Sequence, residues 1–154
     1  MASQWQQWAT RGWFPWESDG WPYWSHSHHV STWGALRGQP NVLFVHFNDL
    51  LADLDGEMRR VAAFLGVSVD EEAWPQLVEE ATFRSMKDEA RRLDAEAGGG
   101  ASTIWRDGTG TFFHKGTNGR WRDVLTDADL ALYEESAGWL DPSLRTWLEQ
   151  GRNG

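Results

Sequence analysis

The feature that most constrains the fold is a single apolar run of β-forming residues, residues 41–47. A continuous run of this kind predicts a strand buried on both faces of a parallel sheet. The sequence offers no second convincing strand. A lone strand would leave backbone N–H and C=O groups unpaired on both edges, which is costly when its faces are apolar. The sequence therefore predicts part of an α/β domain whose other strands come from elsewhere.

Helices are predicted after this run. Acidic residues followed by an apolar stripe indicate a helix over about residues 55–65, and Gly66 suits a left-handed stop after it. Ser68 with Glu71 fits a capping box for a second helix that reaches about residue 81. Pro75 would kink or split that second helix.

The C-terminal part predicts two more helices. Thr126 is a good N-cap for a helix over about residues 127–137, whose first turn is acidic. Asp141 followed by Pro142 fits an N-cap and first position for a last helix ending near residue 148. The chain is thus expected to be mostly helical with one clear central strand.

Composition narrows the class of protein. The chain has 154 residues, a net charge of −9 and no cysteine, so one domain without disulfides or thiolate metal ligands is expected. The acidic balance argues against a nucleic-acid partner. No apolar run approaches the ~20 residues of a membrane-spanning helix, and the first residues do not resemble a signal peptide. We therefore expect a cytoplasmic protein that binds neither nucleic acid nor membrane.

Tryptophan is unusually frequent. Seven of the 12 tryptophans lie in the first 33 residues, within a segment over residues 1–38 that reads as aromatic loop with short helical pieces. Indole rings at this density can bury a large area or form an exposed platform. The second alternative corresponds to a non-enzymatic module that binds glycan or peptide.

The strongest candidate for chemistry is the cationic, glycine-punctuated segment 112–122. Lys115 supplies a point charge and the nearby arginines supply forked donors for phosphate oxygens. Gly116 and Gly119 allow backbone N–H groups to turn inward and form an anion nest. The alternative interpretation is a solvated charge run on a surface loop.

Two further segments are candidates. Phe83 can stack on a nucleobase with the Thr82 hydroxyl beside it, although Phe83 and Met86 also have the spacing of core neighbours on a helix. The three histidines within residues 26–29 could ligate a metal ion. Because neither cysteine nor a following carboxylate accompanies them, packing or contact with a substrate is favoured over a metal site.

These elements occur in an order that resembles the C-terminal part of cytosolic-type sulfotransferases, over about residues 21–148. The resemblance is carried by residues 42–50, by Phe64-Leu65-Gly66, by Thr82-Phe83-x-x-Met86-Lys87 and by Lys115-Gly116-x-x-Gly119-x-Trp121-Arg122. His29-Val30-x-x-Trp33 resembles the segment before the family's strand. The Lys-Gly-x-x-Gly-x-Trp element is the specific one.

The resemblance implies a P-loop-kinase-like α/β domain. Its implied reaction moves a sulfuryl group from 3′-phosphoadenosine 5′-phosphosulfate (PAPS) to a small-molecule alcohol, phenol or amine, without a metal. By position, the cofactor-binding residues are Thr82, Phe83, His114, Lys115 and Gly116, with His114 standing where the family often has arginine. On the same basis, residues 39–154 hold the strand, helices and nucleotide loop, and residues 1–38 border the acceptor. The acceptor-side residues are Trp24, His28 and His29.

What the sequence lacks is also informative. The family's Lys-Ser-Gly-Thr-type phosphosulfate loop and its catalytic histidine have no counterpart here, so no catalytic residue is assigned. Sulfuryl transfer needs charge stabilisation on the leaving phosphate and a base for the acceptor. We therefore expect weak or no turnover by this chain alone, and a missing N-terminal half or a full-length homologue as a partner.

Overall fold

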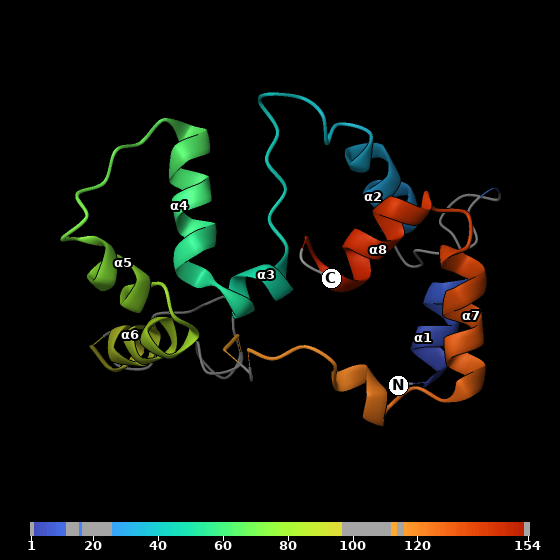
Figure 1. Ribbon diagram of the computed structural model, residues 1–154. Coiled ribbons are helices and arrows are strands. Elements are labelled where there is room, and N and C mark those ends of the chain that lie inside the picture. Colours follow the sequence, from blue (N-terminus) through green and yellow to red (C-terminus); the bar gives the residue numbers. More distant parts are fainter. Residues whose placement is uncertain (1, 12–15, 17–25, 97–111, 114–115, 153–154) are drawn as a thin grey trace. The chain divides into compact units, whose positions relative to one another are not determined.

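The computed structural model describes residues 2–11, 16, 26–96, 112–113 and 116–152 of the chain (Figure 1). The chain divides into two compact units. Unit 1 is formed by residues 1–49 and 119–154, and unit 2 by residues 50–118. In the part of the chain that is described, no helix is long and apolar enough to cross a membrane, and the longest has 14 residues.

Unit 1 is a cluster of helices. They are α1 (Ala2–Thr10), α2 (His26–Gly34), the 3-10 helix η2 (Arg120–Asp123), α7 (Asp127–Ala137) and α8 (Pro142–Gln150). Helix α3 (Phe47–Ala52) begins in unit 1 and ends in unit 2. The core centres on Ala137, Leu140 and Leu144. Gly34 of α2 lies against Leu144, where a Cβ atom would come 2.6 Å from the leucine Cδ2. The helices α2, α7 and α8 therefore share one small core.

Helix α1 packs along α7 (Figure 1). Trp5 donates its indole N–H to the carbonyl of Asp129 at 3.3 Å, and Gln6 donates to the Asp129 carboxylate at 3.4 Å. Asp129 is 1% exposed and completes the predicted cap, because its carboxylate accepts from the Thr126 N–H while its own N–H donates to the Thr126 hydroxyl. The predicted helix at 127–137 and its Thr126 cap are confirmed, as is the Asp141-Pro142 start of α8.

The prediction of a central strand at residues 41–47 is wrong. Residues 42–46 are extended, yet no strand occurs among the described residues, and Phe47 already begins α3. A strand is defined by hydrogen bonds to a neighbouring strand, which an apolar run cannot supply by itself. What the run does provide is packing, since the rings of Phe44 and His46 lie 5.5 and 5.2 Å from that of Trp147 on α8.

Unit 2 contains α4 (Leu54–Leu65), α5 (Trp74–Glu80) and α6 (Phe83–Glu96). Helix α4 confirms the first predicted helix, including Gly66 at its end with φ 67°. The second helix begins later than predicted, at Trp74, and residues 67–70 are irregular. Pro75 lies in the first turn of α5 and does not kink it, because proline's missing N–H is not needed there.

Candidate functional site

The nucleotide-side candidates that the structure describes belong to unit 2. Thr82 precedes α6, and Phe83 is the first residue of that helix. The Thr82 hydroxyl donates to the Glu79 carbonyl at 2.8 Å and accepts from the Ser85 N–H at 3.2 Å. These two bonds fix the turn between α5 and α6, so the start of α6 presents Phe83 in a defined position.

Gly116 lies directly on the Phe83 ring. A Cβ atom at Gly116 would come 2.7 Å from Cγ and Cδ2 of Phe83, closer than side-chain carbons approach one another. The glycine also has φ 62°, in the left-handed region that other residues rarely adopt. Both conditions require glycine, and together they bring the two segments that the sequence singled out into contact.

Aromatic rings and a cation surround this contact. Phe113 meets Phe83 edge-on, with ring centroids 5.9 Å apart, and Phe112 meets Phe113 at 5.0 Å. The Lys87 ammonium lies 5.7 Å from the Phe83 centroid, one helical turn along α6. Sequence reasoning missed Phe113, although it stands in the same motif as Gly116. Phe83, Phe112, Phe113, Lys87 and Gly116 form what we call the Phe83 cluster.

The arginine at the start of α6 has a different role. Arg84 pairs with Glu79 at 2.6 Å, and Ser85 also donates to that carboxylate at 3.3 Å. The hydrogen bond from Arg84 is the main reason why the pKa of Glu79 lies below its usual value. Arg84 therefore supports the α5–α6 turn, whereas the ammonium of Lys87 lies over the Phe83 ring.

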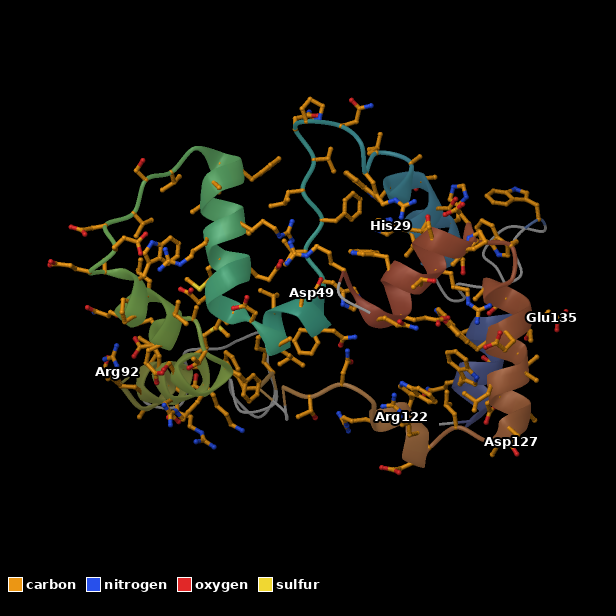
Figure 2. The ribbon with its side chains drawn as sticks, viewed as in Figure 1. His29, Asp49, Arg92, Arg122, Asp127 and Glu135 are labelled. Carbon is orange, nitrogen blue, oxygen red and sulfur yellow. The ribbon has the colours of Figure 1, made fainter. Side chains whose placement is uncertain are left out.

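Three of the predicted site residues, His114, Lys115 and Trp24, lie outside the described residues. Beyond them, Gly119 in unit 1 has φ 81°, and a side chain there would collide with the Arg122 guanidinium. Arg122 lies over the Trp121 ring at 4.7 Å (Figure 2). The second glycine of the motif thus makes room for an arginine stacked on an indole.

The acceptor-side candidates His28 and His29 lie on α2 in unit 1, and both are exposed. The three imidazoles of α2 each approach a different indole. His26 lies 5.9 Å from Trp8, His28 lies 6.0 Å from Trp16, and His29 lies 6.3 Å from Trp33. Trp16 and Trp33 are 68% and 49% exposed, so α2 carries an open aromatic surface.

Hydrogen bonds that we did not predict from the sequence connect the end of α8 to residues 46–49. His46 Nδ1 accepts from the Asn48 N–H at 3.1 Å, so His46 Nε2 donates its hydrogen to the Leu148 carbonyl at 3.0 Å. Both oxygens of Asp49, which is 4% exposed, accept from the Arg152 N–H at 3.1 and 2.9 Å (Figure 2). Both ring nitrogens of His46 are therefore hydrogen-bonded within the fold.

Comparison with known proteins shows the family to which the chain belongs. The family model for the sulfotransferase domain matches residues 16–137. The chain is 31% identical over 128 residues to the glycolipid sulfotransferase of Mycobacterium bovis, and 33% identical over 109 residues to cytosolic sulfotransferase 12 of Arabidopsis thaliana. These alignments cover 82% and 70% of this chain but 38% and 31% of the relatives.

A solved structure shares the fold. The crystal structure of mouse sulfotransferase SULT7A1 complexed with PAP superposes with a TM-score of 0.64 at 24% identity. The match covers 82% of this chain and 45% of the mouse protein. The chain therefore spans less than half of the length of each of these three proteins.

Proposed function

Because this chain belongs to the sulfotransferase domain family, we propose that unit 2 holds part of the nucleotide site of a PAPS-dependent sulfuryl transfer. In that reaction the bond between sulfur and the 5′-phosphate oxygen breaks, and a bond from sulfur to an acceptor oxygen or nitrogen forms. The acceptor loses a proton, and adenosine 3′,5′-bisphosphate (PAP) is released. The observation that supports this proposal is the contact between Gly116 and Phe83.

In this proposal the Phe83 cluster receives the adenosine part of the nucleotide. Phe83 offers a ring whose orientation is fixed by Gly116 and Phe113, and adenine stacks on such rings. Lys115 and the Gly116 N–H bind the 3′-phosphate, and His114 adds a contact that strengthens when its imidazole is protonated. The Thr82 hydroxyl keeps one lone pair for the nucleotide besides its two bonds in the turn.

The sequence carries no counterpart of the loop that would grip the transferred group, so we propose nucleotide binding without efficient turnover by this chain alone. Catalysis would then need the complementary part of a sulfotransferase domain. We further propose a cytoplasmic location, as for the relatives that are named cytosolic.

Trp24, His28 and His29 are proposed to border the acceptor. The exposed indoles of Trp16 and Trp33 beside the α2 imidazoles favour an acceptor with an apolar or ring-shaped face. An alcohol, a phenol or an amine would meet the chemical requirement. Since one relative is named a glycolipid sulfotransferase, a glycolipid hydroxyl belongs among the acceptors to be assayed.

The nucleotide proposal is tested by calorimetric titration with PAP and with 5′-AMP, which lacks the 3′-phosphate. The wild-type chain should bind PAP more tightly, and Lys115→Ala should weaken PAP binding about tenfold while changing 5′-AMP binding little. Arg91→Ala removes an equal charge from an exposed ion pair on α6 and serves as the control. Equal losses in both variants, or no preference for PAP, would refute the assignment.

A further inference from the structure

Helix α6 carries a cation on the same face as Phe83. Phe83 and Lys87 are four positions apart, so their side chains lie one above the other along the helix. Both residues are half-buried, whereas their charged neighbours Arg84 and Asp88 are exposed. The face of α6 that belongs to the Phe83 cluster is therefore partly shielded from water and carries the ammonium of Lys87.

The ammonium of Lys87 has a defined place in this cluster. It lies 5.7 Å from the centre of the Phe83 ring, where it is attracted by the ring's quadrupole. That ring is bounded in turn by the backbone of Gly116 and by the Phe113 ring, whose centre is 5.9 Å away. The ammonium therefore stands beside the ring on which we propose that adenine stacks.

The arginines of α6 are placed differently. Arg84, Arg91 and Arg92 each pair with a carboxylate of α5 or α6, and both partners in these pairs are more than half exposed. Such pairs are screened by water and support the helix locally. The ammonium of Lys87, in contrast, lies against a ring of the candidate nucleotide site. Lys87 is therefore the most suitable of these cations for contact with a nucleotide.

The distance of this ammonium from the ring suits a hydrogen bond to the edge of a stacked base. Stacked rings lie about 3.5 Å apart, so an ammonium at the level of the base, 5.7 Å from the Phe83 centre, would stand about 4.5 Å to the side of the stacking axis. The ring nitrogens of a purine lie at its perimeter, part of the way to that point. The remaining gap is close to the donor–acceptor distance of a hydrogen bond, about 3 Å.

The hydrogen-bonding groups of adenine fit such a donor. The ring nitrogens N1, N3 and N7 accept hydrogen bonds, whereas the amino group donates them. A lysine ammonium only donates. We infer that Lys87 is a specificity residue of the nucleotide site, whose ammonium donates a hydrogen bond to one of these ring nitrogens. This inference rests on the proposed function, and it assigns the base to Lys87 and the 3′-phosphate to Lys115.

A hydrogen bond of this kind should contribute measurably to affinity. Because Lys87 is half-buried, its ammonium has lost part of its hydration, and a bond from a charged donor is stronger in such surroundings than in water. We expect the bond to lower the dissociation constant of an adenine nucleotide about tenfold, with or without a 3′-phosphate. A contact between Lys87 and the 3′-phosphate would instead favour PAP over 5′-AMP.

The test is calorimetric titration of Lys87→Met, which keeps an unbranched apolar stem and loses the donor. This variant should bind PAP and 5′-AMP more weakly by the same factor, about tenfold, whereas Lys115→Ala should mainly weaken PAP. Lys87→Arg, which keeps a cationic donor, should lose less than Lys87→Met. Arg91→Met is the matched control, because it removes an equal charge one turn further along α6. An equal loss in this control would attribute the effect to net charge and refute the inference.

Analogues of 5′-AMP that carry carbon in place of N1, N3 or N7 identify the accepting atom. One of them should bind the wild type about tenfold more weakly than 5′-AMP, and Lys87→Met should not weaken that analogue further. The inference alone would be wrong if Lys87→Met weakened every analogue as much as 5′-AMP, weakened only PAP, or changed neither nucleotide. A wild type that bound neither PAP nor 5′-AMP would overturn the proposed function as well. Thermal unfolding of each variant verifies that it is folded.

Discussion

The polar contacts within unit 1 join residues far apart in the sequence, whereas those within unit 2 are mostly local. In unit 1, hydrogen bonds join His46 to Leu148 and Asp49 to Arg152, pairs that are 102 and 103 positions apart. Most polar contacts in unit 2 join residues within one or two helical turns, such as Arg92 with Glu89. Unit 1 therefore depends on distant segments meeting, whereas the helices of unit 2 are supported locally.

Removing a long-range tie in unit 1 should have the largest effect. In Asp49→Ala, the Arg152 N–H would lose a buried carboxylate acceptor and a cavity would remain, so the free energy of unfolding should fall by about 3 kcal/mol. Urea unfolding followed by circular dichroism measures this loss. Asp49→Asn keeps one acceptor oxygen and the volume, so it should lose clearly less.

Equal stability of Asp49→Ala and the wild type would show that the end of α8 is not fastened at this point. The comparison between the two units would then lose its main support. Hydrogen exchange of the last turn of α8 gives an independent readout, because its amides should exchange faster in Asp49→Ala.

The contact between Phe83 and Gly116 in unit 2 joins residues that lie far apart in the sequence. Gly116→Ala should destabilise unit 2 by about 2 kcal/mol, from left-handed backbone strain plus the collision with Phe83. It should also weaken PAP binding. Gly66→Ala is a matched control, since Gly66 has φ 67° with nothing within 4 Å of its Cβ position, so it reports the backbone cost alone.

If the two glycine variants lost the same stability, the Phe83 ring would move freely out of the way. The Phe83 cluster would then be too mobile to orient an adenine. A larger loss at Gly116, together with weaker PAP binding, supports a rigid cluster. The difference between the two variants thus measures the contact with Phe83.

Features that depend on residues near one another in the sequence could be predicted, whereas those that depend on distant residues could not. The caps of α7 and α8 were predictable because Thr126 and Asp141 bond to N–H groups two or three residues away. Gly66 was predictable because its conformation is a local property. The prediction that Ser68 and Glu71 form a capping box was wrong, because helix α5 starts only at Trp74.

Long-range features were not predictable from local patterns. The strand prediction failed because an apolar run indicates burial, and only a neighbouring strand makes a ladder. The Asp49–Arg152 tie has no local signal either, because its partner lies at the other end of the sequence. The approach of Gly116 to Phe83 was expected from the resemblance to sulfotransferases, and the structure brings these two residues together.

Acid should loosen the attachment of α1 to α7. Hydrogen bonds from the Thr126 N–H, and then from its hydroxyl, hold the pKa of Asp129 below its usual value of 3.8. A carboxyl with a lowered folded-state pKa contributes stability above about pH 4, and this contribution is lost as the pH falls through the folded-state value. The melting temperature of the wild type should therefore fall more steeply between pH 5 and pH 2 than that of Asp129→Asn.

Asp141 and Glu149 also have lowered pKa values, through hydrogen bonds from Ser143 and Arg145 respectively. They add to the acid sensitivity of both proteins equally, so the difference between the two curves isolates Asp129. Parallel curves would mean that the Thr126 cap does not distinguish the charged from the neutral carboxyl. This effect should be smaller than those of Asp49→Ala and Gly116→Ala.

The smallest change in melting temperature is expected for the removal of an exposed ion pair on α6. Arg92 pairs with Glu89 and Glu96 on its own exposed helix face, and these bonds raise the pKa of its guanidinium (Figure 2). Exposed pairs within one helix contribute little, so Arg92→Ala should change the melting temperature by no more than ~1 °C.

Arg145 of unit 1 also pairs with two carboxylates, at 2.7 Å each. These carboxylates belong to Glu134 on α7 and Glu149 on α8, and the Arg145 guanidinium also lies 5.6 Å from the Tyr133 ring. Arg145→Ala should therefore lower the melting temperature by several times as much as Arg92→Ala. Equal changes in the two variants would show that an ion pair between two helices of unit 1 contributes no more stability than a pair within one helix of unit 2.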